Sequence, residues 1–196
     1  MNTQNWSKIT GNFGKFLFKI RGYTPYPIVL IFILFARPSG ASFSMGILLI
    51  IAGELLRIWS VAYAGRETRE RTILASRLVT RGPYAYLRNP IYLGNLIIYT
   101  GVTIMADLWM PYFLFFVWGY FGLQYYFIEA AEAQSLQILF GNEYKTYQDN
   151  VPAWLPFLRR TRSKNLFPPD FAAALRSEKS TFLSIAGVII LLYLKI

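Results

Sequence analysis

The stretch RGPYAYLRNPIYLGN, residues 81–95, joins a polar, basic segment to a long apolar one. Its Gly-Pro pair is typical of a turn, and Asn89 and Pro90 predict a helix start, as N-cap and first helical residue respectively. The apolar run 91–128 follows, so we expect Arg88 at the mouth of a membrane helix. Free N–H groups at the N-terminus of that helix favour a bound anion. The stretch therefore predicts a polar site at the edge of a bilayer.

The composition of the chain is that of a membrane protein. Of 196 residues, 55% are apolar and only 15% are charged, whereas about a quarter of a soluble domain is charged. The chain has no Cys and no His, which excludes disulfides, thiol nucleophiles and an imidazole base. A net charge of +10 in so apolar a chain indicates loops that face anionic lipid. We therefore expect membrane lipids as partners, and neither nucleic acid nor a metal.

The apolar segments predict an all-α integral membrane protein of one domain, residues 1–196, with about five transmembrane helices. The run 91–128 is too long for one helix, and Asp107 and the residues after it interrupt it, so we predict a helical hairpin there. Beyond it, we expect the second arm to continue out of the membrane as a helix to residue 140, with a short helix after Gly141. The predicted parts in chain order are a leader at 1–23, two membrane helices within 24–64 (24–37 and 43–64), a hairpin of 91–106 and 110–128, and a last membrane helix within 179–195.

Two local features of these segments carry further expectations. The leader interleaves apolar residues with Lys8, Lys15, Lys19 and Arg21, which fits either an amphipathic helix on the membrane surface or a plain basic leader. Glycines 94 and 101 of the hairpin share a helix face, and we expect them to let its two arms approach closely.

The distribution of basic residues predicts the orientation. The leader carries four, the loop 65–90 six and the segment 129–178 six, whereas the opposite side has only Arg37 and Lys195. The positive-inside rule therefore places the N-terminus and both polar segments in the cytoplasm. The proposed site then lies on the cytoplasmic face of a multi-pass protein.

The opening stretch also resembles a family signature. It is similar to the motif G-x-Y-x-x-x-R-H-P-x-Y of the isoprenylcysteine carboxyl methyltransferase and phospholipid methyltransferase family, with Asn89 in place of the family's histidine. A second family feature, an acidic pair followed by F-G-x-x-Y-x-x-Y and V-P-x-x-x-P, matches residues 132–156, with Ala133 in place of the second acid. The resemblance covers roughly residues 55–157 and implies a methyltransferase-like catalytic core at 65–157.

The resemblance implies S-adenosylmethionine as the methyl donor, with Arg88 and Glu132 as catalytic residues. Arg88 and the helix N-terminus would bind the donor's carboxylate, Glu132 its ammonium, and the ring of Tyr84 or Tyr92 its sulfonium. Transfer depends on alignment more than on acid–base chemistry, and a carboxylate acceptor needs no base. The predicted cofactor-binding residues are Gly82, Tyr84, Arg88, Asn89, Pro90, Tyr92, Glu132 and Tyr144.

The acceptor is expected to be a lipid or a lipid-modified molecule that enters from the bilayer. Tyr92, Leu93, Leu96 and Tyr99 recur at helical spacing and predict an apolar, aromatic stripe leading down from the motif. Arg57 lies in an apolar segment three residues after a glutamate. It either neutralises that glutamate within its helix or lines the site.

Three functions stay open at this point. Sterol and steroid reductases, which use NADPH, resemble this family through a related segment, and Tyr92 and Gly94 would fit that segment too. A non-catalytic, lipid-binding membrane protein would tolerate Ala133 in place of an acid. The residues 140–156 favour the methyltransferase.

Overall fold

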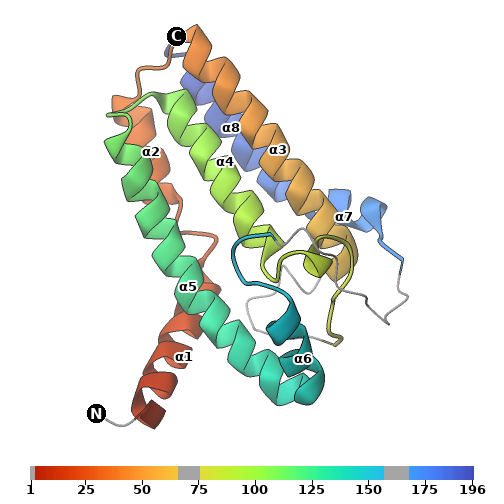
Figure 1. Cartoon of the computed structure of the whole chain (residues 1–196). Helices are drawn as coiled ribbons and strands as arrows, with labels where there is room; N and C mark the ends of the chain where they lie inside the picture. The colour runs from red at the N-terminus through yellow and green to blue at the C-terminus, as the bar shows by residue number, and fades with distance from the viewer. Residues whose placement is uncertain (1–2, 66–75, 157–167) are drawn as a thin grey trace.

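The computed structural model describes residues 3–65, 76–156 and 168–196, with side chains from residue 11 onward, and these residues form helices and no strand (Figure 1). The predicted all-α fold is confirmed. Three predicted features lie outside the described residues, namely Arg66, Arg69 and Arg71 of the basic loop, the segment 157–167 and the side chain of Lys8. The elements are α1 Thr3–Ile20, α2 Tyr26–Phe35, α3 Gly40–Ala64, the 3₁₀ turn η2 Gly82–Ala85, α4 Pro90–Ala106, α5 Tyr112–Phe140, α6 Asn142–Asn150, α7 Phe171–Ser177 and α8 Lys179–Tyr193.

The predicted hairpin forms from α4 and α5. Asp107 ends α4 in the left-handed conformation, with φ of 47°. Helix α5 then runs for 29 residues to Phe140, past the predicted end of its apolar part. Gly141, with φ of 53°, separates α5 from the short helix α6. The continuation of α5 beyond the apolar run, and the short helix after it, are both confirmed.

Glycines bring α4 against α3, which corrects the predicted role of Gly94 and Gly101. A Cβ atom at Gly53 would lie 2.7 Å from the carbonyl oxygen of Gly94. One at Gly46 would lie 2.6 Å from the carbonyl oxygen of Gly101. The prediction that these glycines pack α4 against α5 is wrong, because the glycine face of α4 packs on α3. The side of α4 that faces α5 carries larger side chains.

Helix α3 is long and apolar enough to cross a bilayer, and it is the one described helix that meets both conditions. Its 25 residues extend about 37 Å at 1.5 Å per residue, against a hydrocarbon core of about 30 Å. Helices α2, α4 and α8 are apolar but shorter, at 10 to 17 residues. The predicted count of five membrane helices is therefore not established by the fold.

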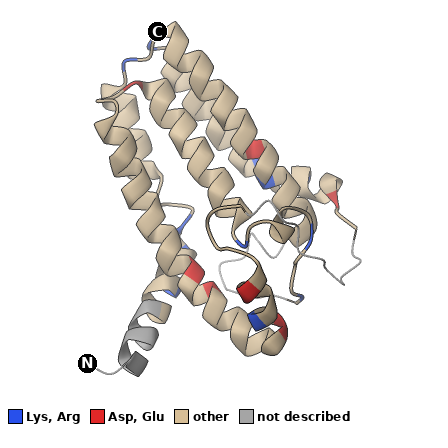
Figure 2. Ribbon diagram, viewed as in Figure 1, with Lys and Arg blue, Asp and Glu red and all other residues tan. Residues whose placement is uncertain are grey.

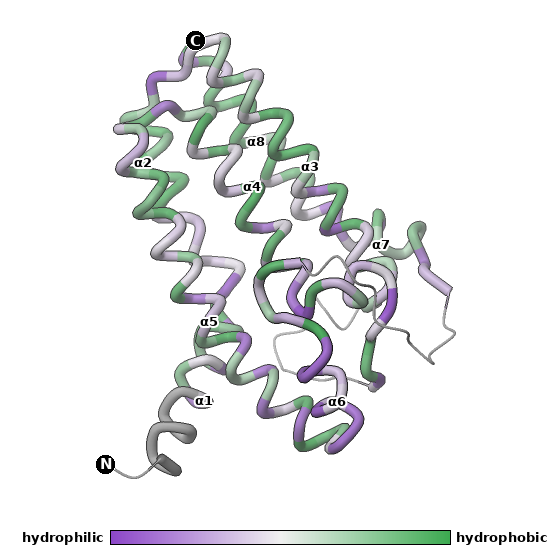
Figure 3. The backbone as a smooth tube through the Cα atoms, in the orientation of Figure 1, coloured by the Kyte–Doolittle hydropathy of each residue, from purple (hydrophilic) through white to green (hydrophobic). Residues whose placement is uncertain are grey.

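Apolar side chains point outward along the helical bundle, while charged residues gather at one end of it. Figures 2 and 3 show the charged and hydrophilic residues concentrated around α6, the loops and the lower part of α5. Apolar surface on this scale is typical of contact with lipid. Large exposed apolar residues of α2, α3, α5 and α8 include Leu30, Leu34, Leu48, Leu55, Phe115, Leu123 and Leu183.

Helix α1 crosses the charged half of α5 (Figure 1). Gly14 packs against the backbone of Phe127 and against Ala131, and Gly11 lies beside the side chain of Gln134. The leader is therefore a helix, as one of the two sequence interpretations has it, and it packs on the protein. At its end, Arg21 stacks over the Phe18 ring, 3.6 Å from the centroid, which brings a basic residue next to the site.

Candidate active site

The two sequence motifs meet in space because three hydrogen bonds join their loops. The backbone N–H of Arg88 donates to the carbonyl of Pro152 at 2.9 Å. The Asn89 side-chain amide donates to the carbonyl of Ala153 at 3.0 Å, and the Tyr147 hydroxyl donates to the carbonyl of Tyr84 at 2.8 Å. The loop before α4 is thus tied to α6 and to the segment that follows it.

Asn89 occupies the N-cap position of α4, and Pro90 is the first helical residue, as predicted. The asparagine does not cap the helix with its side chain, however. Its side-chain amide donates a hydrogen bond to the carbonyl of Ala153 instead, so the side chain does not bond the N–H groups in the first turn of α4. Asn89 holds the two motifs together.

Arg88 lies at the centre of a polar cluster. Its Nη1 atom is 3.1 Å from the Glu129 carboxylate and donates to the Tyr144 hydroxyl at 3.2 Å. One helical turn along α5, Glu132 accepts a hydrogen bond of 3.0 Å from the Tyr92 hydroxyl. The structure therefore brings together four of the residues predicted from the motifs. It adds Glu129, which shares a helix face with Glu132 but lies outside the motif and was not predicted as a site residue.

Both carboxylates of this cluster titrate above their ordinary range. Burial is the main cause for Glu132, whose pKa is raised to about 7, although Arg21 and the bond from Tyr92 oppose the shift. Burial also raises the pKa of Glu129, against the opposing effect of Arg88. Desolvation penalises a lone carboxylate. A cation bound beside these residues would offset that penalty and hold them ionised.

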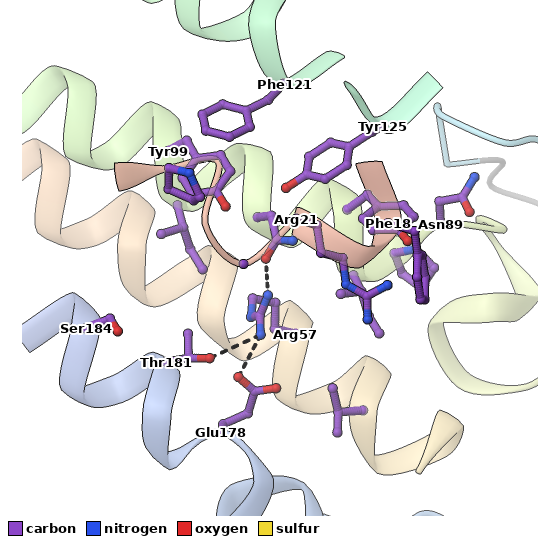
Figure 4. Close-up of a pocket in the computed structure, with 18 of the residues that line it drawn as sticks. Phe18, Arg21, Arg57, Asn89, Tyr99, Phe121, Tyr125, Glu178, Thr181 and Ser184 are labelled. Carbon is purple, nitrogen blue, oxygen red and sulfur yellow. Dashed lines mark hydrogen bonds and ion pairs between the residues drawn. The ribbon is translucent and has the colours of Figure 1, made fainter. Parts of the chain in front are cut away.

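A cavity of about 840 Å³ opens beside this cluster and runs between α2, α4, α5 and α8. Near the loops its walls are polar, and farther along they are aliphatic and aromatic. Figure 4 shows Tyr99, Phe121 and Tyr125 on one side and Arg57 with α8 on the other. The sequence-predicted residues in its walls are Arg57, Tyr84, Arg88, Asn89, Pro90, Tyr92, Tyr99, Glu132 and Tyr144.

Three other predicted residues are absent from these walls. Gly82 has a φ of 61°, and a Cβ atom there would lie 2.5 Å from the ring of Tyr63, so the backbone and its packing require this glycine. Leu93 and Leu96 lie outside the cavity as well. The face of α4 that borders it carries Tyr92, Asn95, Tyr99 and Val102.

Aromatic side chains form the wall of the cavity where α4 meets α5. The rings of Tyr92 and Tyr125 stack with centroids 4.6 Å apart, and those of Tyr99 and Phe121 stack at 3.9 Å. Stacked pairs of this kind hold rings in fixed positions. The predicted stripe on α4 therefore exists in part, because Tyr92 and Tyr99 border the cavity with Asn95 between them and Leu93 and Leu96 do not.

Arg57 is the centre of a second polar cluster, deeper in the bundle. Its Nε atom is 3.3 Å from Glu54, its Nη2 atom is 2.7 Å from Glu178, and its Nη1 atom donates to Asn95. Thr181 also lies near Nη2, at 3.5 Å. Arg57 thus pairs with Glu54 within α3 and also borders the cavity, and its part in binding the acceptor stays a prediction. Sequence reasoning missed Glu178, which comes from a part of the chain that the motifs do not reach.

Comparison with known proteins identifies the family. The model of the phospholipid methyltransferase family matches residues 41–143, more than half of the chain. This chain belongs to the phospholipid methyltransferase family. The matched segment holds α3, the first motif, the α4–α5 hairpin and both carboxylates of the Arg88 cluster.

Within that family the chain is similar to several isoprenylcysteine methyltransferases. It is 32% identical to protein-S-isoprenylcysteine O-methyltransferase B of Arabidopsis thaliana over 121 residues, 59% of either chain. It is 29% identical to the Schizosaccharomyces pombe protein-S-isoprenylcysteine O-methyltransferase over 153 residues, 74% of this chain and 61% of that protein. The alignments thus span about three fifths of these relatives' length. No solved structure gives a significant match to this phospholipid methyltransferase family member.

Proposed function

We propose that this protein is a membrane methyltransferase that uses S-adenosylmethionine to methylate a lipid-modified acceptor carrying a carboxylate. The observation that carries the proposal is one continuous cavity, which joins the Arg88 cluster to apolar walls between α2, α4, α5 and α8. A water-soluble, charged donor fits the polar end, and a hydrocarbon tail fits the apolar end. The names of the relatives support an isoprenylcysteine acceptor.

The residues at the polar end suit the donor's charged groups. Arg88 Nε is buried and has no hydrogen-bond partner among the described residues, so an anion can still be bound there. Glu129 and Glu132 offer two carboxylates to an ammonium, and the stacked rings of Tyr92 and Tyr125 lie next to them. When bound, S-adenosylmethionine supplies a methyl group on a sulfonium, which passes to a nucleophile as the carbon–sulfur bond breaks and its electron pair stays on sulfur.

The proposed acceptor is a carboxylate because the chain has no histidine base and the cavity walls carry more basic than acidic residues. A carboxylate is already deprotonated, so the chain's own residues have no proton to remove, and the chain has no histidine with which to do so. The walls carry five basic residues, Lys19, Arg21, Arg57, Arg77 and Arg88, against the acidic Glu129, Glu132 and Glu178. That balance favours an acceptor with a negative head group. The role of the walls is to bind and orient the donor and the acceptor and to exclude water.

The proposal includes a topology. The motif loops, α6 and the charged half of α5 face the cytoplasm, and the turn between α4 and α5 faces the opposite side. The support is the positive-inside pattern of the sequence, together with the concentration of charged residues at one end of the fold (Figure 2). The donor then enters from the cytoplasm and the acceptor from the bilayer.

Donor binding by the purified protein tests the proposal against its alternatives. Labelled S-adenosylmethionine should bind saturably, and an excess of NADPH should not displace it. Tight binding of NADPH instead would indicate a reductase, and binding of neither would indicate a non-catalytic lipid-binding protein. Arg88→Ala, which removes the guanidinium from the site, should abolish donor binding, whereas Arg37→Ala, far from the cavity, should leave it unchanged.

A further inference from the structure

Helix α8 forms one wall of the cavity and lies beyond the segment that the family model matches, residues 41–143. The character of this wall changes along the helix. Ser180, Thr181 and Ser184 line the cavity near Glu178, interleaved with Leu183 and Ile185, whereas the lining residues of α8 beyond Gly187 are Val188 and Leu191. Hydroxyl groups suit a polar head group and aliphatic groups suit a hydrocarbon. Gly187 lies where the second kind of wall begins.

Gly187 has no packing reason to be a glycine. A Cβ atom at Gly187 would meet no atom within 4 Å, whereas one at Gly53 or Gly94 would lie 2.7 Å from a neighbouring atom. The backbone of Gly187 is helical, without the positive φ that requires glycine at Gly82. Glycine in the interior of a helix costs stability relative to alanine. What this glycine provides is open space on the cavity wall.

The cavity is bordered by exposed side chains of α2 and α8. Tyr26 of α2 and Leu183 of α8 both line it, and they are 60% and 75% exposed. Apolar residues of the other walls include Phe32, Val102 and Val117. A cavity between outward-facing apolar helices suits a chain that arrives from lipid.

We propose that Gly187 determines which hydrocarbon tails the acceptor can carry. The inference rests on the proposed methyl transfer to a lipid-modified acceptor and assigns its tail subsite to α8. Gly187 is nine residues beyond Glu178, or about 14 Å along the helix axis at 1.5 Å per residue. A side chain at position 187 would therefore meet the tail and stay well away from the polar residues around Glu178.

The test replaces Gly187 by leucine and compares tails of different length. The acceptors are S-geranyl-, S-farnesyl- and S-geranylgeranyl-cysteine, and the quantity measured is kcat/KM for each. Each methylene of the tail that can no longer be buried in the cavity should lower kcat/KM about fourfold. Displacing two or three methylenes should therefore lower kcat/KM by about 15- to 60-fold. The loss should grow with tail length and should reside in KM, while the affinity for labelled S-adenosylmethionine stays unchanged.

Two further variants separate this effect from a general one. Gly119 of α5 is also free of neighbours within 4 Å, but it does not line the cavity, so Gly119→Leu should leave all three acceptors at wild-type values. Gly187→Ala, which adds one carbon and favours the helix, should give a smaller shift in the same direction. Equal losses for all tails, or the same pattern in Gly119→Leu, would overturn the role of Gly187. A wild-type protein that methylates none of these acceptors would overturn the proposed function itself.

Discussion

Replacing Glu132 by glutamine should weaken donor binding and remove its dependence on pH. Glu132 lies beside the cavity in the part of α5 that continues beyond the apolar run, with the Tyr92 hydroxyl 3.0 Å from its carboxylate. Burial raises its pKa to about 7. Only the ionised carboxylate makes a charge-assisted contact with an ammonium, which is worth about 1.5–3 kcal/mol, or roughly ten- to a hundred-fold in affinity.

Because of the raised pKa, the affinity for the donor should change with pH in a direction that can be measured. The ionised fraction of a carboxyl group with a pKa of about 7 rises from about 0.1 at pH 6 to about 0.9 at pH 8. Wild-type affinity for S-adenosylmethionine should therefore rise about tenfold over this range. Stability should change in the opposite direction. The folded state keeps a proton that the unfolded state has released, so the free energy of unfolding falls as the pH rises from about 4.5 to 7.

Equilibrium binding of labelled S-adenosylmethionine at pH 6, 7 and 8 measures both effects. Glu132→Gln should bind weakly, with the same affinity at each pH. Glu143→Gln on the exposed surface of α6 is the matched control and should keep the wild-type profile. A wild-type affinity that is constant from pH 6 to 8, or a tenfold rise retained in Glu132→Gln, would refute the reasoning.

Three other predictions follow from the packing, the site and the topology. Gly53→Ala places a Cβ atom 2.7 Å from the Gly94 carbonyl and should cost about 1–3 kcal/mol of stability; a melting temperature in detergent equal to that of the control Gly119→Ala would contradict it. Arg88→Lys keeps the charge but loses the planar guanidinium, whose Nη1 contacts Glu129 and Tyr144 and whose Nε is left to bind an anion, so donor affinity should fall at least about tenfold with unchanged circular dichroism; wild-type affinity would remove Arg88 from the site. In the cysteine-free chain, Ser76→Cys should react with an impermeant thiol reagent from the cytoplasm and Tyr112→Cys from the other side; the reverse pattern would invert the topology.

The elements that local sequence determines were predicted well. Asn89-Pro90 and the break at Asp107 set the bounds of α4, because a proline after an N-cap starts a helix and a left-handed residue ends one. The pairing of Arg88, Tyr92, Glu132 and Tyr144 in one site was predicted from two motifs that lie far apart in the chain. The roles assigned to these residues in donor binding remain predictions.

Features that depend on partners distant in sequence were not predicted. Gly94 and Gly101 indicate a small helix face, but nothing in the pattern says which helix packs on it, and α3 does so instead of α5. The aliphatic spacing that selected Leu93 and Leu96 does not distinguish a lipid-facing or helix-packing leucine from one that borders a cavity. Glu178 is the N-cap residue of α8, beyond the segment that the motifs cover, and its pairing with Arg57 appears only in three dimensions.

Transfer of a labelled methyl group from S-adenosylmethionine to S-farnesyl-cysteine, followed by release of the label with alkali, tests the central claim most directly. The product of methylating a carboxylate is an ester, so the label should be released as methanol on alkaline hydrolysis. S-methyl-cysteine, offered in place of the farnesyl compound, should be methylated far more slowly. Absence of transfer by a purified protein that binds the donor would contradict the account. So would a label that resists alkali, which would indicate methylation of nitrogen, or equal rates for the two acceptors, which would show that the tail is not recognised.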